Sequence, residues 1–404
     1  MSIYESRFNQ IKNLQPFVLV TGGGRSGTDF LQSLLDFHNE VLSFNGHIKL
    51  YIEFFQKSKC IKAKSFDLQD LAHEFVGLYI EKFKTNYDYI ERKDQLGKNE
   101  NDSLNIDPQI FIRNFVSLLE NQAHTHKNIL LGIHAAYHES LGNDFNNLKI
   151  LFYHAHHFDE AFKFIEDFPT ATIICTTRDP RAGFVSSIEN WKKYDNSNRS
   201  PNIFNHDNYL FFYFHLKRII EDEGQLVHSK NNHIIVKLEN LLNRKYMKYL
   251  SNLLKIKFDE SMLVPTFGGK IWYGDRISGT KIRTLEWSGK RTYNGWREKL
   301  SWREKYIINY IMFSKLKRNK YEYDPIKIFG FFLVLILAFI PFKYERRYMS
   351  IGYINSVFRL HRLLALRYLF FTPLTFLKVR ILLIKYAVIQ LLNNYSLKKF
   401  NFLP

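Results

Sequence analysis

Residues 17–31 read Phe-Val-Leu-Val-Thr-Gly-Gly-Gly-Arg-Ser-Gly-Thr-Asp-Phe-Leu, and this stretch decides the fold. An apolar run typical of a buried strand enters a glycine-rich turn, and a helical pattern begins at Thr28. Glycines let several backbone N–H groups converge on one point, and the N-terminus of the helix adds the positive end of its dipole. The stretch therefore predicts a strand–loop–helix unit that binds an anionic group.

The loop differs from the P-loop of nucleotide triphosphatases at one important position. Gly22 and Gly27 have the spacing of the G-x-x-x-x-G-K-[ST] pattern, but Thr28 stands where that pattern has its lysine. Arg25 lies inside the loop instead. Because the usual lysine contact to the β- and γ-phosphates is missing, a plain tight turn stays an alternative unless a second motif indicates anion binding.

A second strand-and-turn unit lies between residues 168 and 191. A buried strand is predicted to end in Arg178-Asp179-Pro180, and a helix is expected to follow. Arg178 and Ser186 stand on either side of this turn and can meet on one phosphate, the guanidinium as a fork and the hydroxyl as a short donor. The alternative is a βα unit whose arginine caps a neighbouring helix.

Together the two units resemble the sulfotransferase superfamily, whose members use the donor 3′-phosphoadenosine 5′-phosphosulfate (PAPS). In that family a [KR]-S-G-[TS] loop holds the 5′-phosphosulfate, and R-[DN]-P-x(5)-S after a second strand holds the 3′-phosphate. The resemblance assigns donor binding here to Gly24, Arg25, Ser26, Gly27, Thr28, Asp29, Arg178, Ser186, Arg291, Trp296 and Arg297.

Weaker matches to the family follow in the expected order within residues 15–324. Residues 235–241 resemble its strand ending in Y-E-D-L, with Leu238 in place of the usual tyrosine. Residues 295–301 resemble its late G-x-W-[RK] segment, which passes the nucleotide. The basic stretch around Arg291 resembles the segment that closes over the 3′-phosphate, and a solvated basic loop is the alternative for it.

The general base is left open between three residues. His134 follows residues 128–133, which read as an apolar strand, and relatives carry a histidine or lysine at a comparable strand end. His47 follows the second predicted strand, where many relatives place a catalytic carboxylate, and Glu53 is the nearest carboxylate. A neutral imidazole suits proton removal at cytoplasmic pH, while Arg25 is expected to stabilise charge on the donor.

Three histidines close together in the sequence, His154, His156 and His157, raise the question of a metal site. No cysteine or carboxylate beside them completes a recognisable ligand pattern, and the resemblance implies an enzyme without a metal. We therefore expect a polar loop at these residues and no metal.

Composition and length indicate an intracellular α/β enzyme. The chain has 404 residues and two widely separated cysteines, Cys60 and Cys175, which favours a reducing compartment. The N-terminus lacks the apolar core of a signal peptide, so we expect the active site to face the cytoplasm. The expected fold is a P-loop-like, mainly parallel sheet flanked by helices over residues 1–324, with a helical insertion at 48–125 that caps the acceptor site.

The C-terminal region, residues 325–404, differs from the rest of the chain in charge and hydropathy. It holds six Lys and six Arg against one Glu, so +11 of the net charge of +18 lies there. Residues 328–342 form an apolar run of 15, shorter than the ~20 residues of a spanning helix. This pattern favours helices that bind an anionic membrane surface through residues 326–404, and not nucleic acid. Packing on the enzyme or on a second subunit, as in a homo-oligomer, is the alternative.

These features predict a membrane-associated, cytoplasmic sulfotransferase. It would move a sulfuryl group from PAPS to a hydroxyl or amine of a glycan, glycolipid or lipid and release 3′-phosphoadenosine 5′-phosphate (PAP). Two other classes stay open. A P-loop kinase would need the missing lysine and a magnesium-binding pattern, and a non-catalytic nucleotide-binding membrane protein could keep the same fold without a base.

Overall fold

A computed structural model of the protein describes residues 2–63, 66–196, 208–221, 224–226, 229–276, 294–325, 327–360 and 362–395. The chain divides into two compact units. The first unit comprises Met1–Thr21, Ser26–Thr177 and Gly224–Trp287, and the second unit comprises Gly22–Arg25, Arg178–Glu223 and Ser288–Pro404.

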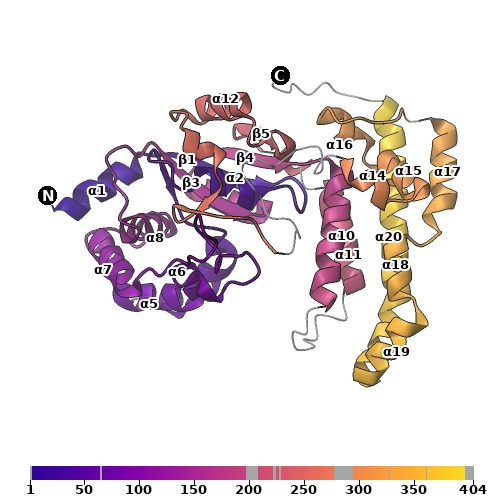
Figure 1. Cartoon of the computed structure of the whole chain (residues 1–404), viewed down its shortest axis with the longest axis horizontal. Helices are drawn as coiled ribbons and strands as arrows, with labels where there is room; N and C mark the ends of the chain where they lie inside the picture. Colours follow the sequence, from indigo (N-terminus) through magenta and orange to yellow (C-terminus); the bar gives the residue numbers. More distant parts are fainter. Residues whose placement is uncertain are drawn as a thin grey trace. The chain divides into compact units, whose positions relative to one another are not determined.

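A five-stranded parallel sheet forms the centre of the first unit (Figure 1). In sheet order its strands are β2 (Val41–Ser43), β3 (Ile150–His156), β1 (Gln15–Thr21), β4 (Thr172–Thr177) and β5 (His233–Lys237). β1 is buried along almost its whole length, as expected for a central strand covered on both faces. Because Thr21 pairs with Thr176, the loops after β1 and β4 begin side by side at the carboxyl edge, where α/β folds place their ligands.

Helices surround this sheet, and the predicted strand–loop–helix unit is confirmed as β1 followed by α2 (Thr28–Leu35). Within the described part of residues 48–125, helical segments lie between Leu50 and Tyr87 and at Pro108–Leu119, whereas residues 88–107 form turns and isolated bridges. The other elements of the first unit are α1 (Ile3–Lys12), η1 (Leu50–Phe54), α3 (Phe55–Lys57), α4 (Lys59–Lys62), α5 (Leu68–Leu78), α6 (Ile80–Phe83), η2 (Thr85–Tyr87), α7 (Pro108–Leu119), α8 (His126–Ser140), α9 (Phe158–Asp167), η5 (Leu238–Asn240), α12 (Arg244–Leu254), η6 (Glu260–Leu263) and the hairpin β6 (Thr266–Phe267) and β7 (Lys270–Ile271).

One predicted strand is wrong, because residues 128–133 lie inside helix α8. Thr125 caps this helix by accepting a hydrogen bond from the backbone N–H of Asn128, and the residues from Ile129 to His138 are all buried. A helix that is apolar on every face shows no helical periodicity, so its sequence cannot be told from that of a buried strand. The N-cap threonine was the signal that indicated a helix.

The described part of the second unit is helical. Its elements are α10 (Pro180–Asn196), α11 (Asn208–Glu221), α14 (Trp296–Lys299), α15 (Trp302–Ile311), α16 (Phe313–Arg318), α17 (Ile328–Ala338), α18 (Lys343–Tyr348), α19 (Ile351–Leu360) and α20 (Arg362–Tyr395). Helix α20 packs against α11, α15 and α17, and one apolar core joins them. The domain boundary predicted at residue 324 therefore does not coincide with the boundary between the units.

Two buried arginines donate hydrogen bonds to carbonyls at the C-terminus of helix α17. Arg303 of α15 donates to the carbonyl of Leu337 at 3.2 Å, and Arg380 of α20 donates to the carbonyl of Ala338 at 2.6 Å. These bonds satisfy carbonyls that a helix C-terminus leaves without partners. Among the described residues one stretch, Ile328–Arg346, is long and apolar enough to cross a membrane by length and composition. The helix itself stops at Ala338, and its 11 residues extend only ~16 Å.

A buried ion pair links Arg380 of α20 to Glu345 of α18. Glu345 also accepts hydrogen bonds from the hydroxyl of Tyr209 at 2.7 Å and from the backbone N–H of Phe342 at 2.7 Å. Removing one member of such a pair leaves an uncompensated buried charge.

We expect Arg380→Met to lower the free energy of unfolding by about 3–5 kcal/mol, because Glu345 would lose its buried partner. Urea unfolding measures this change. Lys378→Met, two positions earlier on the exposed side of α20, is the control and should change stability by less than about 0.5 kcal/mol. Equal stability of the two variants would contradict the role of this ion pair.

Candidate donor and acceptor sites

The end of the glycine-rich loop is fixed to the sheet of the first unit. The hydroxyl of Ser26 lies 2.6 Å from that of Thr21 in β1 and 2.9 Å from that of Thr176 in β4. Gly27 has φ 89°, and a Cβ at this position would lie 2.5 Å from a methyl carbon of Leu238. Glycine is therefore required here both by the backbone and by the neighbouring side chain.

The tip of the loop, Gly22–Arg25, is held by two cations of the second unit. The buried ammonium of Lys315 donates to the carbonyls of Gly22 and Ile219, both at 2.6 Å. The guanidinium of Arg178 donates to the carbonyl of Arg25 at 3.3 Å. Arg25 itself has φ 63°, a left-handed conformation that non-glycine residues seldom adopt. These bonds fix the loop carbonyls, so its backbone conformation is set before any ligand binds.

The first turn of α10 lies against this loop tip. The Asp179 carboxylate accepts a hydrogen bond from the backbone N–H of Arg181 at 2.9 Å and so caps the helix. A Cβ added to Gly183 would lie 3.5 Å from the carbonyl oxygen of Gly24. The N-terminus of a 17-residue helix, with its positive dipole end, is thus next to the glycine-rich tip, as an anion site requires.

Two adjacent serines lie on α10 near the loop tip. Ser186, the residue predicted from the motif, is half-buried. Ser187 is buried, and its hydroxyl has no hydrogen-bond partner among the described residues. That hydroxyl lies 3.6 Å from the position of a Cβ on Gly24. Sequence reasoning missed Ser187, because the motif spacing points to its neighbour and burial is not visible in the sequence.

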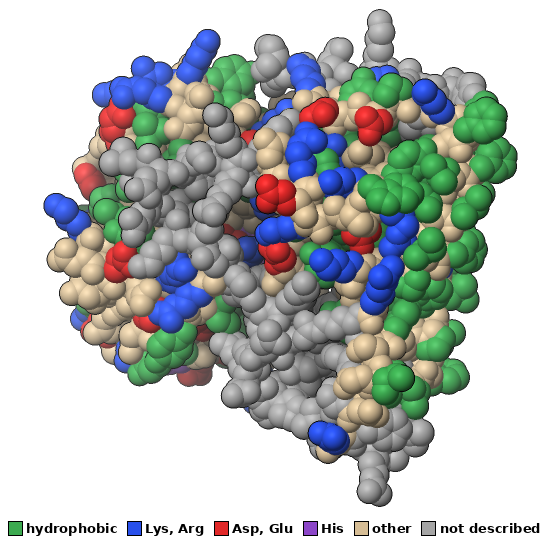
Figure 2. Space-filling view, turned by 45° about the vertical axis from the view of Figure 1, so that its right-hand side comes forward, with side chains coloured by type: hydrophobic (Ala, Val, Ile, Leu, Met, Phe, Trp, Pro, Cys, Tyr) green, Lys and Arg blue, Asp and Glu red, His purple; other side chains and the backbone are tan. Residues whose placement is uncertain are grey.

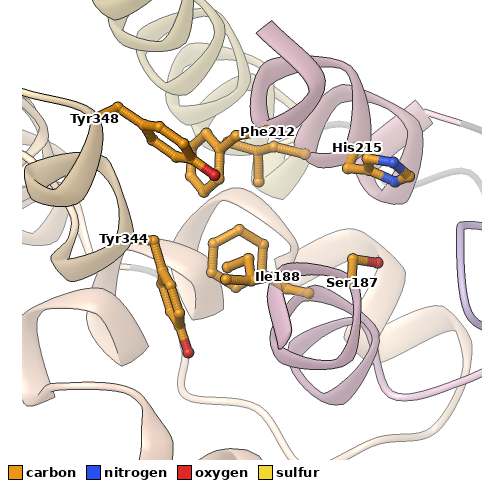
Figure 3. A pocket seen from close by; sticks show the side chains of 8 residues that line it. Ser187, Ile188, Phe212, His215, Tyr344 and Tyr348 are labelled. Atoms are coloured by element: carbon orange, nitrogen blue, oxygen red, sulfur yellow. The ribbon is translucent and has the colours of Figure 1, made fainter. Parts of the chain in front are cut away.

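A small, mainly apolar pocket adjoins this part of the second unit (Figure 3). Ser187 and His215 form its polar side, and a Cβ on Gly24 would lie 3.4 Å from Nδ1 of His215. Burial, together with the positive charges of Arg218 and Arg25, lowers the pKa of His215 to about 4, so its ring is neutral at pH 7. The other lining residues are Phe184, Ile188, Phe212, Leu216, Tyr344 and Tyr348. The pocket can hold an apolar group beside the loop tip.

Trp296 is buried, and two guanidinium groups lie over its ring. The guanidinium of Arg181 lies 4.2 Å from the ring centroid and that of Arg297 lies 4.8 Å from it. Arg297 also forms an ion pair with Glu322 on the surface. The structure therefore gives both residues packing roles, and their predicted contact with the donor stays a prediction. Arg291 lies outside the described residues.

A small polar pocket lies in the first unit along α2. Asp29, in the first turn of this helix, and Trp272 both line the pocket. The indole N–H of Trp272 donates a hydrogen bond to the carbonyl of Glu91 at 2.6 Å. The remaining lining residues are Gln32, Ser33, Asp36, Gly46, Glu91, Lys93, Thr266 and Phe267. Carboxylates, amide, hydroxyl and one tryptophan together suit a polyhydroxylated ligand.

The charges in this pocket are partly balanced. Lys93 forms an ion pair with Glu91 and lies 3.7 Å from Asp88. Burial opposes the ionised form of Glu91, but Lys93 and Lys82 outweigh it and lower the pKa of Glu91 to about 2. Burial raises the pKa of Asp36 to about 6. The pocket therefore contains carboxylates with well-separated pKa values.

His47, one of the predicted bases, is paired with a buried carboxyl group. Its Nε2 lies 3.0 Å from Oε2 of Glu160 in the first turn of α9, and the hydroxyl of Tyr153 donates to Oε1 of Glu160 at 2.6 Å. Burial raises the pKa of Glu160 to about 8. Burial, and then the neighbouring His156 and His154 rings, lower the pKa of His47. Once Glu160 is ionised, its carboxylate accepts a hydrogen bond from Nε2–H of His47, and Nδ1 is then the ring atom that can accept a proton.

The other two predicted bases are placed differently. His134 lies in α8 and not at a strand end, with Nδ1 2.9 Å from the carbonyl oxygen of Leu130 and its ring packed near Phe44 and Tyr153. Burial lowers its pKa to about 4. Glu53 is bonded to Lys57 at 2.8 Å, which lowers its pKa. The strand-end argument for His134 is therefore wrong, and Glu53 is a weaker base than an ordinary carboxylate.

Comparisons with known proteins bear on the family of the chain. A family model described as "Sulfotransferase family" matches residues 16–246, more than half of the chain. Among solved structures, the "Sulfotransferase Domain from the Synechococcus PCC 7002 Olefin Synthase" matches with a TM-score of 0.37 and 17% identity, covering 70% of this chain and 88% of that one. A comparison with curated proteins gave no significant match. The matched residues include the glycine-rich loop, Arg178 and Ser186, and the chain belongs to the sulfotransferase family.

Proposed function

We propose that the protein transfers a sulfuryl group from PAPS to a hydroxyl or amine of a glycan carried on a lipid. The geometry of the loop tip, Gly22–Arg25, carries this proposal. Lys315 and Arg178 donate hydrogen bonds to carbonyls of the tip, and the first turn of α10 lies beside it. Such a loop fits a donor with two anionic ends, because backbone N–H groups and a guanidinium are available without the lysine that a triphosphate requires.

PAPS would supply the sulfuryl group, and this chain would supply binding and proton removal. Backbone N–H groups of residues 24–28 hold the phosphosulfate, and the Arg25 side chain neutralises its charge. Arg178 and Ser186 bind the 3′-phosphate, and the buried hydroxyl of Ser187 is a further donor on the same helix. The family membership supports this assignment.

The polar pocket of the first unit is the proposed acceptor site. Its carboxylates can accept hydrogen bonds from sugar hydroxyls, and Trp272 offers an apolar face. Gly46 lines the pocket and precedes His47, so the His47–Glu160 pair is the proposed base. Nδ1 of His47 would take the acceptor proton while Glu160 holds Nε2.

The C-terminal helices are the proposed membrane attachment, on the cytoplasmic face. Apolar side chains on α17 and on its neighbour α20 are exposed, among them Phe329 at 89% and Ile336 at 68% (Figure 2). Lys343, at the start of α18, and Lys378, in α20, are also exposed. Because α17 ends on buried arginines after 11 residues, we propose that these helices lie in the plane of an anionic bilayer and do not cross it.

We expect PAP to bind the full chain and Arg178→Ala to weaken its binding by about 10–100-fold, because a charge-assisted hydrogen bond contributes about 1.5–3 kcal/mol. Lys315→Met should also weaken binding, since the loop carbonyls lose their donor. Isothermal titration calorimetry measures both effects. Lys317→Met, exposed two positions away, is the control. Unchanged PAP affinity in Arg178→Ala and Lys315→Met would rule out this donor site.

The His47–Glu160 pair should lose a proton as the pH rises through about 8, the pKa of the buried Glu160. Below this pH the carboxyl keeps its proton and Nδ1 of His47 is protonated; above it, Nε2 carries the proton and Nδ1 can act as a base. Imidazole ¹⁵N chemical shifts followed by NMR report this change. Glu160→Gln should abolish it, whereas Glu166→Gln on the exposed side of α9 should not. The same His47 transition in Glu160→Gln would exclude the pair.

The full chain should bind vesicles of phosphatidylcholine with phosphatidylglycerol more tightly than pure phosphatidylcholine vesicles. Replacing Phe329 and Ile336 by Glu should weaken sedimentation with the anionic vesicles by at least about tenfold, because each apolar side chain contributes about 1.5–3 kcal/mol when buried. Leu78→Glu, an exposed leucine of the first unit, is the control. Equal sedimentation of the double variant and the control would contradict attachment through α17.

A further inference from the structure

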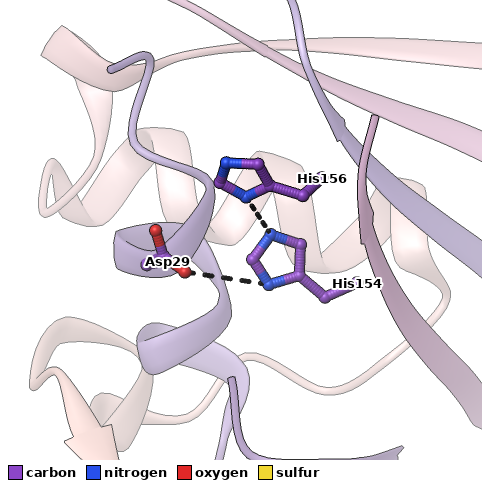
Figure 4. A group of neighbouring side chains, drawn as sticks. All are labelled: Asp29, His154 and His156. Carbon is purple, nitrogen blue, oxygen red and sulfur yellow. Dashed lines mark hydrogen bonds and ion pairs between the residues drawn. The ribbon is translucent and has the colours of Figure 1, made fainter. Parts of the chain in front are cut away.

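We propose that Asp29, His154 and His156 form a binding site for one divalent transition-metal ion, with Zn²⁺ as the best fit. All three residues belong to the first unit, and one possible ligand atom from each lies within 4.8 Å of the others. Figure 4 shows His156 beside Nε2 of His154 and the Asp29 carboxylate on the Nδ1 side of the same ring, 4.0 Å from that nitrogen. The site shares Asp29 with the polar pocket, and its test measures metal binding and not sulfuryl transfer.

The spacing of the two imidazoles fits a metal ion. Nε2 of His154 and Nδ1 of His156 are 3.3 Å apart. Two nitrogens bound to Zn²⁺ at ~2.0–2.1 Å with a tetrahedral angle lie ~3.3 Å from each other. In the metal-free protein one ring proton fits between these atoms. Metal binding would displace that proton and use both nitrogen lone pairs.

A second contact orients His154 as a ligand. Its Nδ1 lies 2.6 Å from the amide oxygen of Gln32, which fixes the tautomer with the proton on Nδ1 and leaves Nε2 as the ligand atom. Metal-binding histidines almost always have such a partner on the second ring nitrogen. Gln32 lies on α2, less than one turn after Asp29, so one helix supplies both the carboxylate ligand and the orienting amide.

The fold brings these residues together from distant parts of the sequence. His154 and His156 are alternate residues at the end of β3, and His156 has φ 60°. The register between β1 and β3 shifts between Leu19 and Val20, beside these histidines. Asp29 lies in the first turn of α2. It supplies the carboxylate that the sequence around the histidines lacks. The expectation of no metal rested on that missing ligand and on the family resemblance.

The donor set decides the class of metal. Two imidazoles and one carboxylate favour Zn²⁺, Co²⁺ or Ni²⁺ over Mg²⁺ or Ca²⁺, which prefer all-oxygen sites. Asp29 is half-exposed and lines the polar pocket, so the fourth coordination position would be open to solvent or to a ligand in that pocket. The pair of Lys93 with Glu91 reduces the positive charge that would oppose a cation there.

Titration of the full-length, tag-free protein with Co²⁺ tests this site, because tetrahedral Co²⁺ has intense visible absorption. We expect one equivalent to bind and Zn²⁺ to displace it. His156→Ala and Asp29→Ala should each weaken binding by more than about 100-fold, and Gln32→Leu by about 10–100-fold. His157→Ala, the next residue in the chain but not a member of the cluster, should bind Co²⁺ like the unchanged protein.

Circular dichroism and thermal unfolding of each variant establish that it is folded. Excess Mg²⁺ should leave the Co²⁺ spectrum unchanged. No tetrahedral Co²⁺ spectrum in the folded protein would overturn the proposal. So would one equivalent of Co²⁺ bound equally well by folded His156→Ala and Gln32→Leu, because the ion would then be held by other residues.

Discussion

The contact of the Lys315 ammonium with the carbonyls of Gly22 and Ile219 is the constraint on which the proposed donor site depends. A loop that points its N–H groups at an anion must turn its carbonyls the other way, where they still need donors. Lys315 and the Arg178 guanidinium supply these donors inside the second unit. Two short bonds to carbonyls compensate the burial of the ammonium. The glycine-rich sequence alone permits many loop shapes, and these cations select one of them.

Local sequence patterns were enough to predict a strand and a turn that depend mainly on neighbouring residues. The apolar run before Gly22 gave β1, and the Arg178-Asp179-Pro180 turn was placed correctly between β4 and α10. The failure at residues 128–133 has a physical cause, because a helix buried on all sides loses the periodicity that distinguishes it from a strand. The helical C-terminal region was expected, but its packing with α11 and α15 depends on contacts that no local pattern records.

In the candidate sites too, some residues could be predicted from local sequence and others could be found only from the structure. Arg178 and Ser186 followed from motif spacing, whereas Ser187 could be found only from its burial. Glu160 is 113 residues from His47, and Lys315 is 293 residues from Gly22, so neither partner could be read from the sequence near the site. The polar pocket, the His47–Glu160 pair and the cluster at Asp29 all lie in the first unit, at or beside the carboxyl edge of its sheet.

Thermal unfolding of the intact protein tests whether the loop and α10 bind a 3′-phosphorylated adenine nucleotide. We expect PAP to raise the unfolding temperature and ATP with magnesium to leave it nearly unchanged, because the loop has Thr28 in place of the lysine that contacts a triphosphate. Stabilisation by ATP with magnesium, and none by PAP, would contradict the account and indicate a kinase-like nucleotide site.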